Sequence, residues 1–397
     1  MKKCVLGDYI LDMASGPFGS NLKVGCFVSS GFPIIDGANL YGVRVTDNVT
    51  KFVTEEKARS LSRSIAKRHD VIVTISGTLG QVAYIPSDSL YEEYLCSQRQ
   101  FRVTFDESKI DVEYLVNLLH TDYGQKKILS FANYVGVPAL SQPLPNFRRI
   151  ELELPDIEKQ HEIANIISTI DRKIALNRKR IATLEAMAKE IYDYWFVQFD
   201  FPDAHGRPYK SSGGAMVYNP DLKREIPKGW EVKALGELMT VCNGKDHKAL
   251  ADGDIPVYGS GGIMRRVNQK QYDGESVLIP RKGSLNNIMY VNGPLWCIDT
   301  MFYTKAKVVN GMKYIFMTIK DWDFASMDSG SAVPSMTAGL INQLMIVFPT
   351  LQYLSAFENQ VAPLFSRRFS LENEVARLSS LRDFLLPLLM NGQVKVG

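Results

Sequence analysis

Two long stretches of the chain repeat apolar residues at alternating spacings of four and three. In the first stretch these positions are Ile163, Ile167, Ile170, Ile174, Asn177, Ile181, Leu184, Ala188, Ile191 and Trp195. In the second they are Phe357, Val361, Leu364, Arg368, Leu371, Val375, Leu378, Arg382, Leu385 and Leu389. This spacing is typical of a coiled-coil seam and predicts two long helices.

A single amphipathic helix more often covers the core of its own domain, and that interpretation is open for each helix taken alone. Two matched helices favour an intramolecular pair. We expect it to be antiparallel, because a pseudo-two-fold axis across it would place two domains at opposite ends. Asn177 would then be either a register-setting polar residue in the seam or a solvent-facing side chain. Pro363 is expected to kink or to start the second helix.

The chain also contains an internal repeat in its β-rich segments. The segment 70–84, DVIVTISGTLGQVAY, aligns without gaps on 276–290, SVLIPRKGSLNNIMY. Both have the pattern of a strand, a glycine-containing turn and a second strand. Further parallels link Leu6-Gly7 to Leu235-Gly236, Val137-Pro138 to Val333-Pro334, and Pro155 to Pro349 ahead of each helical stretch. Each half therefore reads as a β-rich domain followed by a helix.

The predicted fold class is α+β, with two β-rich α/β domains separated by two long helices that form an antiparallel coiled coil in a pseudo-two-fold internal repeat. The expected boundaries are 1–150 and 229–350 for the β-rich domains, and 151–200 and 351–392 for the helical regions. Residues 201–228 are rich in Gly, Pro, Ser and Asp without sustained periodicity, so we expect a linker that partly packs on a surface.

Composition places the chain among ordinary globular proteins. Of its 397 residues 45% are hydrophobic and 22% are charged, which fits two or three domains and excludes a disordered or fibrous class. Five cysteines without a C-x-x-C pair argue against a disulfide framework and indicate a reducing cytoplasm. We expect no signal peptide and no membrane span. A net charge of +3 does not by itself indicate a nucleic-acid partner.

No catalytic motif stands out in the sequence. There is no phosphate-binding G-x-x-x-x-G-K-[ST] loop, no G-x-S-x-G elbow and no metal-binding histidine pair. We therefore expect a non-catalytic chain that binds neither a cofactor nor a metal ion itself.

The two aligned turns suit recognition of a polymer. In each, a glycine would let backbone amides approach a phosphate, while Arg281 or Lys282 could pair with guanine. Amides such as that of Asn286 could pair with adenine. The candidate DNA-binding residues are Ser76, Thr78, Arg281, Lys282, Ser284, Asn286 and Asn287. The alternative for each turn is a plain hairpin with solvated side chains.

Several fragments, in their order along the chain, resemble the specificity (S) subunit of type I restriction-modification systems. They are GPFGSNLK and FPIIDGANL in the first half, DFPDAHGRPYKSSGG and EIPKGWEVKALGEL at the join, IPVYGSGGI and GSAVPSM in the second half, and the ending LRDFLLPLLMNG. The resemblance covers nearly the whole chain. It implies that 1–150 and 229–350 are target recognition domains and that 151–200 and 351–392 are the conserved helical regions.

The resemblance also implies a function. Such a subunit binds double-stranded DNA at a bipartite, asymmetric target and docks two methyltransferase (modification) subunits, with restriction/translocase subunits joining them. S-adenosylmethionine, ATP and Mg are then expected on the partner subunits. Two alternatives stay open at this point: a coiled-coil scaffold with two β-rich domains that bind protein or glycan, and a recognition module that has outlived its methyltransferase.

Overall fold

The computed structural model describes residues 1–327 and 335–394. The chain divides into two compact units, Met1–Asn177 with Glu374–Gly397, and Arg178–Asn373, so that each unit contains one half of each long helix. Val333-Pro334 and the first five residues of GSAVPSM lie outside the described residues.

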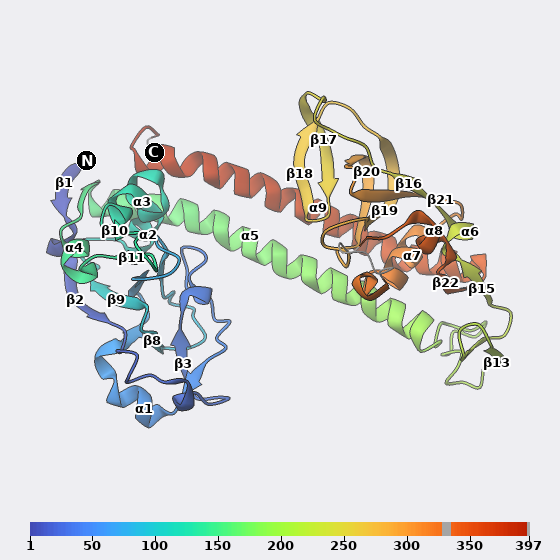
Figure 1. Ribbon diagram of the computed structural model, residues 1–397, viewed down its shortest axis with the longest axis horizontal. Coiled ribbons are helices and arrows are strands. Elements are labelled where there is room, and N and C mark those ends of the chain that lie inside the picture. The colour runs from blue at the N-terminus through green and yellow to red at the C-terminus, as the bar shows by residue number, and fades with distance from the viewer. Residues whose placement is uncertain (328–334, 395–397) are drawn as a thin grey trace. The chain divides into compact units, whose positions relative to one another are not determined.

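The β-rich part of the first unit has two four-stranded sheets, ordered β2-β9-β6-β7 and β4-β3-β8-β5, with the small pairs β1-β12 and β10-β11 (Figure 1). Helix α2 (Val112–His120) packs on the first of these sheets and buries its apolar face in the core. The strands are β1 (Lys2–Val5), β2 (Ile10–Ser15), β3 (Phe32–Ile35), β4 (Phe52–Val53), β5 (Ile65–Lys67), β6 (Val71–Thr74), β7 (Val82–Tyr84), β8 (Glu93–Cys96), β9 (Gln100–Phe105), β10 (Ala132–Asn133), β11 (Ala139–Leu140) and β12 (Glu151–Leu154). The remaining helices before α5 are α1 (Glu55–Ser60), α3 (Asp122–Leu129) and α4 (Pro143–Arg148).

The second unit has a six-stranded sheet, ordered β16-β21-β19-β20-β17-β18, and the pairs β13-β14 and β15-β22. Its strands are β13 (Met216–Asn219), β14 (Arg224–Pro227), β15 (Glu231–Ala234), β16 (Met239–Asn243), β17 (Asp252–Gly259), β18 (Gly262–Val267), β19 (Tyr272–Pro280), β20 (Met289–Cys297), β21 (Met301–Ala306) and β22 (Met345–Phe348). The short helices are α6 (Leu235–Leu238), α7 (Met312–Ile319) and α8 (Ala338–Gln343).

The repeat predicted from the sequence is present in the strand pairing. Strand β1 pairs antiparallel with β12 ahead of the first long helix, and β15 pairs in the same sense with β22 ahead of the second. A glycine, Gly7 or Gly236, stands just after the first of these strands in each half. A side chain at Gly7 would crowd the carbonyl of Arg148, and one at Gly236 would crowd the carbonyl of Asn342. The two halves therefore share a backbone scaffold.

Helices α5 (Ile157–Tyr192) and α9 (Leu351–Met390) match the two predicted seams. None of the twenty seam positions is exposed, and each is buried or half-buried. The helices begin two residues after Pro155 and Pro349, as expected. Pro363 does not start the second helix, so this part of the prediction is wrong. Helix α9 begins twelve residues earlier and continues through Pro363.

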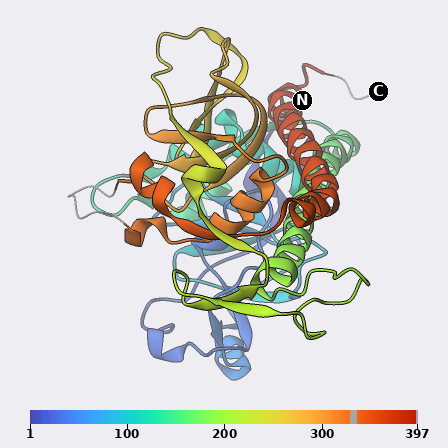
Figure 2. The ribbon, with the colours of Figure 1, turned by 90° about the vertical axis from the view of Figure 1, so that its right-hand side faces the viewer.

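The helices pair in the antiparallel sense. In the second unit, Glu185 of α5 meets Arg368 of α9, and Phe196, eleven residues further on, meets Phe357, eleven residues further back. In the first unit, Asp171 pairs with Arg382 at 2.9 Å. The side-by-side course of α5 and α9 can be followed in Figures 1 and 2. Arg368 and Arg382, the two charged seam residues, thus carry ion pairs across the seam.

The segment after α5 packs rather than hanging free. The last turn widens into a π-helix at Asp193–Val197, and Phe199 and Phe201 beyond it are 2% and 1% exposed. The rings of Phe201 and Trp230 stack at 4.8 Å. The aromatic residues at the start of the predicted linker therefore belong to the core of the second unit.

Asn177 lies in the seam, so the solvent-facing interpretation is wrong. The residue is fully buried, and neither its amide nitrogen nor its amide oxygen has a hydrogen-bond partner in the described part of the chain. Burial of an amide without a compensating hydrogen bond costs stability, and a buried polar residue in a coiled-coil seam typically specifies its register.

We expect Asn177→Leu to raise the free energy of unfolding by about 1–3 kcal/mol, because the substitution removes the desolvation penalty at similar side-chain volume. Urea denaturation followed by circular dichroism measures the change. The matched control is Asn165→Leu on the exposed face of α5, which should shift stability by less than about 0.5 kcal/mol. Equal or lower stability of Asn177→Leu would contradict the argument.

Candidate nucleic-acid interface

The two aligned turns occupy the same place in their domains. The first connects β6 to β7 and the second connects β19 to β20. Gly77 has a φ of 97° and Gly283 a φ of 83°, a left-handed conformation that strongly favours glycine. In each turn the N–H two residues later, of Leu79 or Leu285, donates to the glycine carbonyl. The sequence alignment of 70–84 with 276–290 is therefore a structural equivalence.

Each turn is held between the same two neighbouring segments. The N–H of Ile75 donates to the carbonyl of Arg99 at 2.7 Å, and the N–H of Arg281 donates to the carbonyl of Thr300 at 2.8 Å. On the other side, the Ile75 carbonyl accepts from Leu140, and the Arg281 carbonyl accepts from Met336. Short bridges pair Ser76 with Ala139 and Lys282 with Ser335.

A further loop packs beside each turn, and a glycine in it lies very close to the main chain of one of the two neighbouring segments. An ideal side-chain carbon on Gly16 would lie 1.8 Å from the carbonyl oxygen of Ser97, and one on Gly244 would lie 1.8 Å from that of Ile298. We call the resulting clusters of turns the loop faces. The first loop face comprises 16–19, 75–79, 97–100 and 138–140, and the second comprises 244–247, 281–288, 298–301 and 335–336.

The basic candidates stand exposed on the second loop face. Arg281, Lys282 and Ser284 are all exposed. Their side chains make no hydrogen bond or ion pair with any other residue in 1–327 and 335–394. On the first loop face, Thr78 is exposed and Ser76 is half-buried.

Asn286 and Asn287 are exposed, and their amides make hydrogen bonds to neighbouring segments. The Asn286 amide donates to the Asp323 carboxylate at 2.9 Å and accepts from the Ala325 N–H at 3.0 Å. Its hydrogen bond is the main reason that the pKa of Asp323 lies below its ordinary value. The Asn287 amide donates to the carbonyl of Ser260 at 2.7 Å. Both amides therefore brace the turn, and Arg281, Lys282 and Ser284 remain the groups free to face a ligand.

Arg99 belongs to the first loop face and was missed by sequence reasoning. It is exposed, and its guanidinium lies 3.7 Å from the place where a side chain on Gly77 would begin. It has no ion pair among the described residues. Arg99 comes from a separate segment between β8 and β9, so nothing local in the sequence signals its contact with the turn. Arg99 is the only cation on 75–79 and 97–100, because the turn itself carries only small polar and apolar residues.

The base of each turn is fixed by a tyrosine. The Tyr84 hydroxyl donates to Glu113 of α2, and the Tyr290 hydroxyl donates to Glu275 of β19 at 2.8 Å. Burial, followed by the neighbouring carboxylate, raises the pKa of both tyrosines above the ordinary value. Both therefore stay protonated and anchor the strands that flank the turns.

The described residues contain no group of three or more His, Cys, Asp or Glu side chains that could hold a metal ion. Among the helices of the described part of the chain, none is both long and apolar enough to cross a membrane.

Comparison with known proteins gives a consistent result. The family model described as "Type I restriction modification DNA specificity domain" matches residues 29–186 and 227–361. The chain is 23% identical over 370 residues to the type I restriction enzyme MjaIX specificity subunit of Methanocaldococcus jannaschii, covering 87% of this chain and 82% of the relative. It is 23% identical over 319 residues to the HindI specificity subunit of Haemophilus influenzae, covering 62% of this chain and 69% of the relative.

Among solved structures, the fold is similar to that of the type I restriction-modification S subunit from M. genitalium. The TM-score is 0.66 at 18% identity, and the match covers 98% of this chain and 95% of the other. This likeness extends to both β-rich domains and both long helices.

We expect Gly244→Ala to destabilise the second domain by about 1–3 kcal/mol, because the methyl group would overlap the Ile298 carbonyl. Trp296, whose indole N–H donates to the adjacent Lys245 carbonyl, allows fluorescence-monitored unfolding near this loop. Gly261→Ala is the matched control, since nothing lies within 4 Å of its added carbon. A Gly244→Ala variant as stable as Gly261→Ala would show that the close approach is not required.

Proposed function

Since the chain belongs to the family of type I restriction-modification DNA specificity subunits, we propose that it reads a bipartite, asymmetric DNA target and recruits the modification and restriction subunits to it. As a specificity subunit it is a non-catalytic member of its complex. The observation that carries the proposal is the pair of equivalent loop faces, built on one scaffold but carrying different exposed side chains.

Each loop face is proposed to read one half-site. Exposed guanidinium, ammonium and hydroxyl groups on glycine turns suit contacts to base edges and phosphates. The proposed recognition domains are 1–150 and 229–350, and the helical regions 151–200 and 351–392 connect them. A duplicated scaffold accounts for two half-sites, as a single loop face would not.

The two half-sites are proposed to differ. Arg281 and Lys282 occupy positions equivalent to Ile75 and Ser76, so the second loop face presents two cations where the first presents none. Arg99 supplies a cation to the first loop face from a different segment. Different donors in different places favour different bases, which makes the target asymmetric.

The catalytic groups are proposed to reside on other subunits. Two methyltransferase subunits would dock on the helical regions with S-adenosylmethionine, and restriction/translocase subunits would add ATP and Mg. Base methylation requires a flipped base in a pocket of the methyltransferase. Family membership argues against the alternative of a scaffold that binds protein or glycan.

In the assembled complex, Arg281→Ala should relax one base position of the second half-site and cost about 1–3 kcal/mol there, the usual value of a bidentate contact to guanine. Methylome sequencing of cells with wild-type chain, variant chain and no chain measures this. Cells lacking the chain should lose the methylated motif.

The matched control is Arg265→Ala, a half-buried arginine of the same domain that is paired with Asp252, and it should leave the motif unchanged. If Arg281 contacts a phosphate, the substitution should weaken binding to all DNA sequences by a similar factor. If the motif and the affinity both stay unchanged, the turn is a plain hairpin that does not contact DNA through Arg281.

The helices are proposed to act as a ruler between the half-sites. Inserting four residues after Asn177 and four after Val375 adds about 6 Å to each helix and nearly restores the seam. The doubly extended protein should recognise the same half-sites with one or two more base pairs between them, at about 3.4 Å per base pair.

Extending only one helix is the matched control, because it mismatches the seams and should lose stability or activity. Methylome sequencing gives the spacer directly. A folded, active double insertion that keeps the wild-type spacer would show that the helices do not set the distance.

A further inference from the structure

A cluster of buried charges joins the second recognition domain to α9. Lys313 of α7 has a side chain only 6% exposed, and its ammonium lies 2.6 Å from the Glu275 carboxylate of β19. The same ammonium forms an ion pair with Glu358 of α9. Burial raises the pKa of Glu358, although the Lys313 charge opposes the shift. One lysine thus connects the sheet of the domain to the helix.

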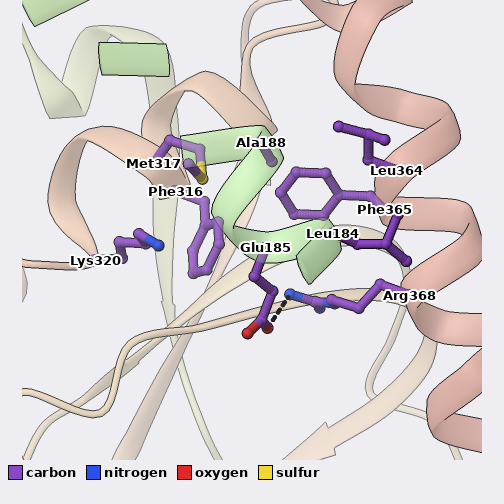
Figure 3. Close-up of a pocket in the computed structure, with 9 residues that line it drawn as sticks. All are labelled: Leu184, Glu185, Ala188, Phe316, Met317, Lys320, Leu364, Phe365 and Arg368. Carbon is purple, nitrogen blue, oxygen red and sulfur yellow. Dashed lines mark hydrogen bonds and ion pairs between the residues drawn. The ribbon is translucent and has the colours of Figure 1, made fainter. Parts of the chain in front are cut away.

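A second cation, further along α9, also connects the helix to the domain. Arg368 of α9 donates to the main-chain carbonyl of Tyr290 in β20 at 3.3 Å, and it pairs with Glu185 of α5 at 3.5 Å. Figure 3 shows its guanidinium directed at Glu185, with Phe365 of α9 and Phe316 of α7 nearby. The aromatic ring of Phe365 lies 5.2 Å from the guanidinium carbon, a cation–π distance.

Both cations act on the strands that carry the recognition turn. Glu275 lies in β19, which leads into the turn, and Tyr290 lies in β20, two residues after the turn ends at Ile288. The Tyr290 hydroxyl also donates to Glu275, so the two strands are tied together at the point where Lys313 and Arg368 hold them. The position of the turn on α9 therefore depends on this cluster.

The first half of the repeat lacks the cluster. Glu113 of α2 stands where Lys313 stands, because 111–120 aligns on 311–320. Counted from the start of each long helix, Ala164 stands where Glu358 stands, and Ile174 stands where Arg368 stands. Ala164 belongs to the apolar core that the first domain shares with α5. The first domain does make polar contacts to α5 elsewhere, where the Asp111 N–H donates to Gln160 and the Asp111 carboxylate pairs with His161. At the positions equivalent to Glu358 and Arg368, however, its long helix carries apolar side chains.

Buried charges add orientation more than stability. Removing charges from water is costly, and well-packed apolar residues are often equally stable in their place. Hydrogen-bonded ion pairs, however, are satisfied only over a narrow range of distances and angles. Apolar packing at the equivalent positions of the first half shows that this scaffold does not need charges there to pack a domain on its helix.

We propose that Lys313 and Arg368 are positioning residues that fix the second recognition turn on α9, and that they thereby set how strictly the complex selects its spacer length. The inference rests on the proposed function, because it assigns a role within recognition of a bipartite target. Neither residue needs to contact DNA.

The test uses the assembled complex and methylome sequencing. We expect the Lys313→Met complex to methylate targets whose spacer is one base pair shorter or longer than normal. Methylation of these targets should be at least about tenfold higher than with the wild-type complex, and the bases of both half-sites should stay the same. Lys313→Arg retains the charge and should restore the wild-type spacer. Lys270→Met, which removes an exposed ion pair with Asp273 in the same domain, is the matched control and should leave the spacer unchanged.

Because Lys313→Met leaves the half-buried Glu275 and Glu358 carboxylates without their cation, it can fail to fold. The second variant therefore combines Lys313→Met with Glu275→Gln and Glu358→Gln, which removes the whole charge set, and thermal unfolding checks its fold. A role in stability alone would lower the melting temperature without changing the spacer distribution.

The outcomes separate the two proposals. Relaxed spacer selection in a folded charge-free variant, with intact half-sites, supports the positioning role. Wild-type spacer selection in that folded variant overturns it and leaves the proposed function standing. If the wild-type complex itself methylates no bipartite target, the proposed function fails and the positioning role fails with it.

Discussion

The pairing of α5 with α9 completes the hydrophobic core of each half of the molecule. In the first unit, Leu389 and Met390 at the end of α9 share a core with Leu6 and Val71 near the start of the chain. In the second unit, Phe357 and Val361 of α9 share a core with Trp195 in the π-helical turn after α5. Neither helix buries its apolar stripe alone, and neither core is closed without both. Domain packing and helix pairing thus depend on the same contacts, made by residues that lie far apart in sequence.

Polar groups inside this packing limit which arrangements are possible. Asn177 lies in the seam without a hydrogen-bond partner among the described residues, and Arg382 and Arg368 cross it to carboxylates on α5. An apolar seam alone would permit neighbouring registers at similar energy, whereas a misplaced charge in the seam would be buried without compensation. Stability is given up at these positions in return for a defined register.

The loop faces show how one backbone carries two different sets of exposed side chains. Gly16 and Gly244, and again Gly77 and Gly283, occupy equivalent places because the scaffold needs close approach and positive φ there. The side chains between these glycines are under no such constraint, so Arg281 and Lys282 can stand where the first half has Ile75 and Ser76 without altering the fold. The exposed side chains of the turn can vary because the glycines, together with hydrogen bonds such as those of the Asn286 and Asn287 amides, hold it in place.

The sequence by itself determined the repeat, the two seams and the glycine turns, because periodicity and backbone conformation are local properties that each residue expresses where it stands. Only the tertiary structure decided which polar side chains are free. The amides of Asn286 and Asn287, which the sequence makes candidates for base contacts, brace their turn against Asp323 and Ser260, and Arg99 reaches the first turn from a distant segment. Lys313 likewise meets Glu275 and Glu358 only after the sheet has packed on α9. Hydrogen-bond partners are chosen by the segments that packing brings together, and no local pattern in the chain records that choice.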